Sequence, residues 1–134
     1  MHTIAHGVDI VEVARIRAML KAHPRRFVAR VFTEHESARS AGRRRAEHLA
    51  ARFAAKEAVM KALGTGLTGG IAWTEIEVVT LPSGAPSLRL SGRAAEIARG
   101  LGIRAWLVSL SHVESLAMAS VIGIGNPAKT TRAA

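Results

Sequence analysis

The sequence predicts an α+β fold, in which several helices pack against an antiparallel sheet. Apolar residues recur with a helical period in the first half of the chain and alternate with polar residues in the second half. Turns rich in glycine and proline separate the alternating segments. The expected order of elements is β-ααα-ββ-α-ββ, with the sheet supplied mostly by the C-terminal half.

The chain is expected to begin with a strand and a helix. Residues 4–8 are apolar and predict the strand. Asp9, with Glu12 three residues later, predicts a capping box for a helix that begins near residue 10. Pro24 ends this helix, because the residue before a proline disfavours the helical conformation.

Further helices follow up to residue 63. Residues 26–32 predict a short helical segment, and Thr33 with Glu36 gives a second capping signal. A long helix is predicted over about residues 44–63, because this stretch is rich in strong helix formers. Gly64 stands directly after it, where a C-cap glycine belongs.

The second half of the chain is expected to supply most of the sheet. Residues 64–70 contain four glycines in seven positions and predict a flexible loop. After it we expect strands around residues 76–79, 88–90, 106–110 and 116–124, with a helix over residues 93–101. One domain is predicted over residues 1–125, followed by a disordered tail over residues 126–134.

Composition limits the class of protein. The 134 residues are 49% apolar, enough for one domain with its own core. The absence of cysteine excludes disulfide scaffolds, cysteine-ligated zinc and thiol catalysis. No apolar run is long enough to span a membrane, and the first residues lack the layout of a secretory signal. We therefore expect a cytoplasmic protein with no membrane partner.

The charge balance predicts an anionic partner. Lys and Arg number 19 against 10 Asp and Glu, a formal net charge of +9. The partner classes are nucleic acid, a phosphorylated metabolite, an acidic protein and an acidic membrane surface. A nucleic-acid-binding module would bind with a steep salt dependence. Only 4% of the residues are aromatic and no recognition motif is present, which counts against that class. We expect no nucleic-acid partner.

The long helix carries a lysine where apolar residues are expected. On a helical wheel, Lys56 falls within the apolar stripe, whereas Glu57 and Lys61 lie on its flank. One interpretation is a surface Glu57–Lys61 pair with a Lys56 side chain that extends to solvent. The other is a carboxylate and two ammonium groups that face a cleft for phosphate and a metal ion. The helix alone leaves both open.

Two residues at strand ends have a structural and a functional interpretation. Asp9 suits a helix cap, but it also stands where a carboxylate would face a ligand. Two carboxylates with phosphate oxygens and water would suit Mg²⁺. His112 suits either a structural or a catalytic role. The glycine loop fits neither the P-loop nor the dinucleotide-binding pattern, so the residues taken singly indicate a basic, phosphate-handling domain.

Taken together, these segments resemble the holo-[acyl-carrier-protein] synthase family of phosphopantetheinyl transferases. The matching motifs are GVDIVE at residues 7–12, RFAAKEA at 52–58, KALG at 61–64, WTEIEV at 73–78 and SLSH at 109–112. Their order and spacing hold over about residues 4–124, nearly all of the expected folded chain. One motif would be a weak signal, but the joint pattern is specific.

The resemblance implies transfer of 4′-phosphopantetheine from coenzyme A to a serine of an apo acyl carrier protein. It also implies Mg²⁺ as cofactor, adenosine 3′,5′-bisphosphate as the second product, and a homotrimer with sites between subunits. The carrier would be acidic, of the fatty-acid type or of the polyketide or peptide-synthetase type. Such a partner agrees with the charge of +9 and predicts salt-sensitive association. An inactive trimeric relative that acts as a scaffold is the alternative.

The same resemblance implies roles for individual residues. Asp9 and Glu57 would bind Mg²⁺, and Glu57 and Lys61 would be catalytic, with Lys61 in contact with the phosphate under attack. The implied coenzyme A-binding residues are Arg52, Lys56, Lys61, Gly64, Gly66, Pro86 and His112. The implied carrier-protein-binding residues are Arg15, Arg26 and Phe27.

Overall fold

A computed structural model of the chain describes residues 1–128. The strands are β1 (His2–Glu12), β2 (Ile76–Thr80), β3 (Pro86–Leu90), β4 (Ile103–His112) and β5 (Leu116–Gly125). The helices are α1 (Val13–Ala22), α2 (Pro24–Val31), α3 (Glu34–Arg39), α4 (Arg45–Leu63) and α5 (Gly92–Leu101), with 3₁₀ turns η1 (Gly66–Gly69) and η2 (Trp73–Glu75). The α+β fold class is confirmed, with four α-helices instead of three between the first two strands.

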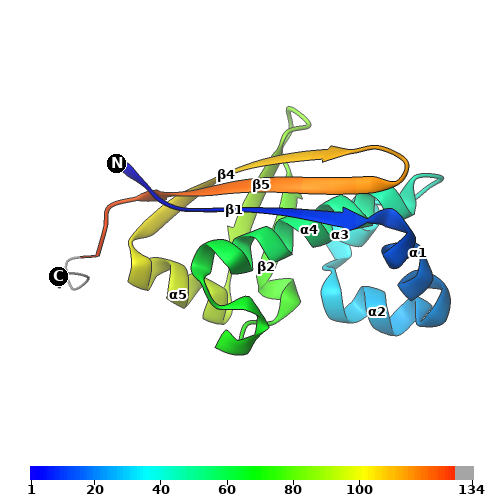
Figure 1. Cartoon of the computed structure of the whole chain (residues 1–134), viewed down its shortest axis with the longest axis horizontal. Helices are drawn as coiled ribbons and strands as arrows, with labels where there is room; N and C mark the ends of the chain where they lie inside the picture. Colours follow the sequence, from blue (N-terminus) through cyan, green and yellow to red (C-terminus); the bar gives the residue numbers. More distant parts are fainter. Residues whose placement is uncertain (129–134) are drawn as a thin grey trace.

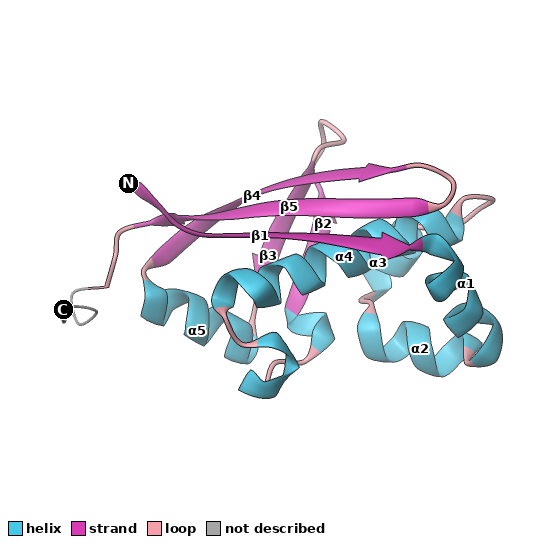
Figure 2. Ribbon diagram, in the orientation of Figure 1, coloured by secondary structure: helices cyan, strands magenta, loops and turns pink. Residues whose placement is uncertain are grey.

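Two antiparallel sheets form in place of the one expected. β1, β5 and β4 make a three-stranded sheet in that order, so β5 is central, and β2 pairs with β3 in a separate hairpin. Figures 1 and 2 show the three-stranded sheet as one layer, with the helices lying on one side of it. The sheet therefore has one covered face and one face free of helices.

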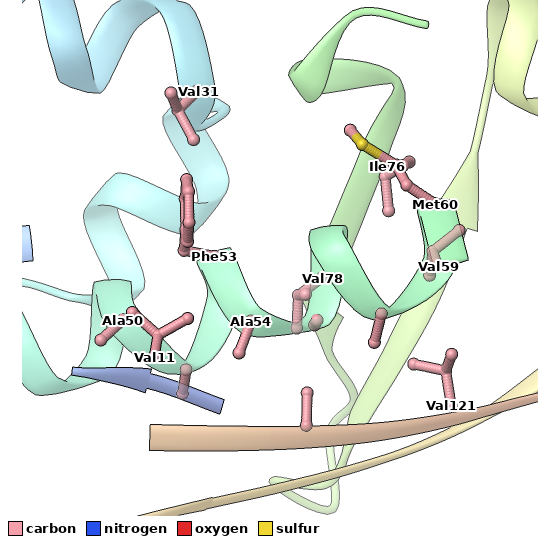
Figure 3. Close-up of a cluster of buried hydrophobic side chains, with 14 of the residues drawn as sticks. Val11, Val31, Ala50, Phe53, Ala54, Val59, Met60, Ile76, Val78 and Val121 are labelled. Atoms are coloured by element: carbon pink, nitrogen blue, oxygen red, sulfur yellow. The ribbon is translucent and has the colours of Figure 1, made fainter. Parts of the chain in front are cut away.

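Helix α4 is the centre of the hydrophobic core. In Figure 3, its Phe53 lies against Val31 of α2, and its Met60 lies against Ile76 of β2. Val121 of β5 lies on the side of the helix that faces the sheet. Small buried residues between these positions let the helix approach the sheet closely; they are Ala50, Ala51, Ala54, Ala55 and Ala58. α4 thus fixes the sheet, the hairpin and the N-terminal helices relative to one another.

Local sequence signals set several helix boundaries, as predicted. Gly64 ends α4 with a left-handed φ of 78°. Pro24 separates α1 from α2 and begins the second of these helices. Thr33 caps α3 in a reciprocal capping box with Glu36, in which each side chain accepts a hydrogen bond from the other residue's backbone N–H.

The prediction that Asp9 caps the first helix is wrong. β1 continues past Asp9 as far as Glu12, and α1 begins at Val13 without a side-chain cap. Pairing with β5 keeps the segment extended, since Asp9 lies opposite Ala119 and Glu12 opposite Leu116 in the register. Asp9 is therefore free for another role. The tail predicted over residues 126–134 lies, from residue 129 onward, outside the described residues.

Gly7 allows β1 to pass very close to α4. A Cβ atom at this position would lie only 2.1 Å from the carbonyl oxygen of Ala58 and 3.2 Å from the backbone nitrogen of Ala62. Both contacts are with helix backbone, which cannot move aside as a flexible side chain can. The close approach brings the segment that follows Gly7 against the C-terminal half of α4.

Gly7→Ala is therefore expected to destabilise the fold, by about 2 kcal/mol or more, because the added methyl group must push β1 away from α4. Gly100→Ala in α5 is the matched control, because a Cβ there meets no atom within 4 Å. The control is expected to be neutral or to stabilise by about 0.5 kcal/mol. Urea unfolding of both variants measures the difference. Equal unfolding free energies would contradict the close approach.

The free face of the three-stranded sheet carries several large exposed apolar residues. Its exposed large residues come from all three strands: Val8 and Ile10 of β1, Leu107 of β4, and Leu116 and Met118 of β5. Exposed apolar residues gathered on one face are typical of a protein–protein contact.

Within residues 1–128, no helix has the length and apolar character needed to cross a bilayer.

Candidate active site

A carboxylate from β1 meets a carboxylate and an ammonium group from α4. Side chains alternate along a strand, so Gly7, Asp9 and Val11 all face the helix. Glu57 and Lys61 are four residues apart on α4 and share one face. Lys61 Nζ donates hydrogen bonds to Asp9 Oδ1 at 2.7 Å and to the carbonyl oxygen of Val8 at 3.1 Å. The structure therefore brings together the three residues implied to hold the metal and catalyse transfer.

The surroundings of Glu57 disfavour its negative charge. Burial raises the pKa of the Glu57 carboxyl, and the neighbouring Asp9 carboxylate raises it further. Asp9 is only 12% exposed, and its Oδ2 is buried without a hydrogen-bond partner among the described residues. Lys61 neutralises one side of Asp9, and its hydrogen bond to Asp9 raises the pKa of the Lys61 ammonium group.

This arrangement fits a hard divalent cation. Mg²⁺ takes oxygen ligands, and it is often held by one or two carboxylates together with phosphate and water oxygens. Asp9 and Glu57 supply the carboxylates, and Asp9 Oδ2, which has no hydrogen-bond partner within residues 1–128, is an available ligand atom. No group of three or more His, Asp or Glu side chains suited to a metal occurs within residues 1–128. Mg²⁺ bound by two carboxylates commonly completes its coordination with substrate and water oxygens.

A pocket of about 390 Å³ lies between α4, the β2–β3 hairpin and β4. Three residues implied to bind coenzyme A line it: Arg52, Pro86 and His112. Two further basic residues that were not predicted from the sequence, Arg39 and His48, also line this basic pocket. His48 is four residues before Arg52, one helical turn away, which was a usable signal. No local signal marks Arg39.

Polar contacts orient the basic groups at one end of this pocket. His112 Nδ1 lies 2.9 Å from Glu47 Oε1, and the His48 ring meets the His112 ring edge-on at 5.3 Å. Burial lowers the pKa of His48, and the nearby His112 lowers it further. Arg52 donates from Nη1 to the carbonyl oxygen of His48, but its buried Nε has no partner among the described residues. A buried donor without a partner is suited to an anionic ligand.

Lys56 lies in the core instead of on a cleft wall. It is 0% exposed and forms an ion pair with Glu36, also 0% exposed, at 2.8 Å. Its Nζ also donates to the carbonyl oxygens of Trp73 and Ile76, so all three ammonium protons are used within the protein. The interpretation in which the Lys56 side chain extends to solvent is therefore wrong, because the side chain is fully buried. Direct contact of Lys56 with coenzyme A stays a prediction. Burial lowers the pKa of Lys56, and Glu36 opposes that shift.

The residues implied to bind a carrier protein lie in different environments. Arg15 is exposed on α1, with its guanidinium 5.4 Å from the centre of the Phe53 ring, and it lowers the pKa of Glu57 in opposition to burial. Arg26 is exposed on α2. Phe27 is only 7% exposed and packs edge-on against Phe32, so it belongs to the core. Its side chain is not available for a docking surface in this structure.

The glycine loop lies at the opposite end of α4 from the basic pocket. Gly64 and Gly66 both adopt left-handed conformations, with φ of 78° and 55°. Arg52 is twelve residues before Gly64, which corresponds to about 18 Å along the helix axis. Five of the seven residues implied to bind coenzyme A therefore lie on two sides of the Asp9–Glu57–Lys61 cluster, whereas Lys61 belongs to the cluster and Lys56 to the core.

Comparison with known proteins identifies the family. A model of the 4′-phosphopantetheinyl transferase superfamily matches residues 5–119 of the chain. The chain belongs to that superfamily. Within it, the chain is a phosphopantetheinyl transferase of the holo-[acyl-carrier-protein] synthase type, because curated relatives of that type align along most of its length.

Two such relatives illustrate the likeness in sequence. The holo-[acyl-carrier-protein] synthase of Koribacter versatilis is 47% identical over 117 residues, covering 87% of this chain and 94% of the relative. That of Chloroflexus aurantiacus is 52% identical over 130 residues, covering 87% and 95%. The likeness therefore extends over nearly the full length of both relatives.

Solved structures of this type of transferase share the fold. The synthase of Neisseria meningitidis superposes with a TM-score of 0.82 at 30% identity, over 92% of this chain and 99% of that one. The synthase of Helicobacter pylori, solved in complex with coenzyme A, superposes with a TM-score of 0.79 at 28% identity, over 89% and 99%. The arrangement of α4, the three-stranded sheet and the hairpin is therefore that of the family.

Proposed function

We propose that this chain transfers 4′-phosphopantetheine from coenzyme A to a serine of an apo acyl carrier protein, and that the reaction requires Mg²⁺ and releases adenosine 3′,5′-bisphosphate. The observation that carries the proposal is the meeting of Asp9, Glu57 and Lys61 between β1 and α4. Transfer of a phosphoryl-type group depends mainly on positioning and charge stabilisation. A pair of carboxylates beside a lysine is suited to both tasks.

In this proposal each group has a distinct task. Asp9 and Glu57 hold Mg²⁺, which when bound offsets negative charge on the pyrophosphate. Lys61 is 58% exposed, so its ammonium group can contact a phosphate oxygen while it remains beside Asp9. The serine hydroxyl loses its proton to water as its oxygen forms a bond to the β-phosphorus. The bond from that phosphorus to the bridging oxygen breaks, and this oxygen leaves with adenosine 3′,5′-bisphosphate. Lys61 stabilises the charge that collects on the phosphate oxygens during this exchange.

The basic pocket is the proposed site for the nucleotide portion of coenzyme A. Arg52 and His112 supply positive charge or hydrogen-bond donors, and Pro86 supplies an apolar surface. The unpartnered Nε of Arg52 gains an acceptor when an anionic ligand enters. Gly64 and Gly66 are proposed to leave room for the rest of coenzyme A near the other end of α4, since a Cβ-free backbone permits close approach.

Intact mass spectrometry tests the proposed reaction. An apo acyl carrier protein is incubated with this chain, coenzyme A and Mg²⁺, and its mass is expected to rise by one phosphopantetheine group. EDTA is expected to prevent the gain, and excess Mg²⁺ to restore it. No gain with fatty-acid, polyketide or peptide-synthetase carriers would contradict the proposal, and a gain that EDTA leaves unchanged would contradict the metal assignment.

The carrier protein is proposed to dock on the basic surface of α1 and α2. Arg15 and Arg26 are exposed there, and Arg15 lies close enough to Glu57 to lower its pKa. An acidic carrier docked at Arg15 would therefore present its serine near the Asp9–Glu57–Lys61 cluster. Because these contacts are exposed, carrier affinity is expected to fall as salt concentration rises.

A homotrimer is proposed as the active assembly, with the apolar face of the three-stranded sheet as its contact surface. The exposed apolar residues on that face would be buried against further copies of the chain. Sedimentation equilibrium is expected to give three times the chain mass of 14.2 kDa. Ile10→Asp is expected to yield monomers, whereas Leu81→Asp, an exposed apolar site outside this sheet, keeps the trimer. A monomeric unmodified chain would contradict the assembly.

A further inference from the structure

A buried network of polar side chains joins α3, α4 and the β2–β3 hairpin. Glu36 Oε1 accepts hydrogen bonds from Lys56 Nζ at 2.8 Å and from the Thr33 backbone N–H at 2.9 Å. Glu36 Oε2 accepts one from the Val78 backbone N–H at 2.7 Å. The network reaches the surface through Thr33, whose hydroxyl donates to Glu77 at 2.6 Å. Buried charges are costly, so a network of this kind needs a structural or functional reason.

The network replaces a missing strand along one edge of β2. Backbone groups of alternate residues in a strand face the same edge. On the edge away from β3, the Ile76 carbonyl oxygen accepts from Lys56, the Val78 N–H donates to Glu36, and the Thr80 N–H donates to His35 Nε2. Three residues in alternate positions on this edge therefore each have one backbone group bonded to a side chain of α3 or α4. The position of the hairpin depends on those side chains.

The hairpin fixed in this way forms one wall of the basic pocket. Thr80, Gly84 and Pro86 line the pocket from the hairpin, and Arg52 lines it from α4. Arg52 and Lys56 are four residues apart and lie on the same face of α4. Lys56 thus holds β2 one helical turn away from the point where Arg52 faces the pocket. The contacts of Lys56 and Glu36 with β2 therefore lie outside the pocket, next to the turn of α4 that carries Arg52.

We infer that the buried Glu36–Lys56 pair is a positioning device for coenzyme A binding: it holds the β2–β3 hairpin at the distance from α4 that the ligand needs, without touching the ligand. The inference rests on the proposed function, in which the basic pocket takes the nucleotide portion of coenzyme A. It gives Lys56 a role in that binding different from direct contact. Loss of the pair therefore weakens coenzyme A binding and leaves the chemical step intact.

The double variant Glu36→Gln/Lys56→Met tests the inference. It removes both charges at similar volume, and replacing both partners of a buried ion pair is tolerated far better than replacing one. The KM and the calorimetric Kd for coenzyme A are expected to rise at least about tenfold, because small displacements of binding groups have effects of that size. The kcat at saturating coenzyme A is expected to stay within about twofold of the unmodified value.

Two further variants complete the experiment. Arg89→Met is the matched control, since it removes an exposed ion pair with Glu77 from the same hairpin and is expected to leave the KM unchanged. His35→Ala removes the exposed contact to Thr80, so it spares the core and is expected to raise the KM about threefold. This second variant carries the test if the double variant does not fold.

The outcomes separate the inference from the proposed function. If the unmodified chain does not bind coenzyme A in calorimetry, the proposed function fails. If it binds and the folded double variant binds equally well, the inference alone fails. A tenfold fall in the kcat of the double variant at saturating coenzyme A, with the KM unchanged, would also overturn the inference, because the pair would then act on the chemical step. If the double variant does not fold, an unchanged KM for coenzyme A in His35→Ala would overturn the inference instead.

Discussion

Replacing Glu57 by glutamine is expected to reduce the rate of phosphopantetheine transfer at least about a thousandfold, while the fold is retained. Glutamine keeps the shape of the side chain but removes the negative charge that would bind Mg²⁺ beside Asp9. Burial and the Asp9 carboxylate already raise the pKa of Glu57, so the folded chain gains nothing from this charge in the absence of the metal. The melting temperature is therefore expected to stay the same or to rise slightly.

Intact mass spectrometry of the carrier over time measures the rate, and thermal unfolding monitors the fold. Glu96→Gln is the matched control, since it makes the same change at an exposed glutamate of α5 that pairs only with Arg93 in the described structure. This control is expected to transfer at the unmodified rate. A Glu57→Gln variant that retains the unmodified rate at saturating Mg²⁺ would refute the metal assignment for Glu57.

Features that depend on neighbouring residues could be predicted from the sequence. The long helix, its glycine end and the Thr33–Glu36 capping box all arise from interactions within a few positions along the chain. The helical wheel also placed Lys56 correctly among buried residues, so the sequence required a partner for it. The cluster of Asp9, Glu57 and Lys61 was predicted only through the family resemblance. Local patterns could not predict it, because β1 and α4 are far apart in sequence.

Features that depend on distant contacts could not be predicted in the same way. Asp9 and Glu12 have the spacing of a capping box, but pairing with β5, more than a hundred residues later, keeps them in a strand. The partner of Lys56 is Glu36, on another helix, and no local pattern connects the two. The family resemblance implied that Phe27 lies at the carrier-binding surface, yet its helical spacing to Val31 is that of a buried stripe, and the side chain is buried.

Lys56→Met alone is expected to destabilise the fold by about 3–5 kcal/mol, because it leaves the Glu36 carboxylate buried without a counter-charge. The carbonyl oxygens of Trp73 and Ile76 also lose their donor. Most domains are stable by only about 5–15 kcal/mol, so the single variant is expected to be close to unfolding at room temperature. Denaturant unfolding measures the free energy directly.

The double variant Glu36→Gln/Lys56→Met is expected to recover most of that loss, since neither charge then remains buried. Arg93→Met, which breaks the exposed pair with Glu96, is expected to change the unfolding free energy by less than about 1 kcal/mol. Comparing Lys56→Met with the double variant gives the cost of the unpaired buried charge. Comparing it with Arg93→Met separates that cost from the cost of losing a long side chain. If the single and double variants were equally unstable, the lost hydrogen bonds of Lys56, and not the unpaired Glu36 charge, would dominate. In that case the pair would act on the hairpin through its contacts with the β2 backbone alone.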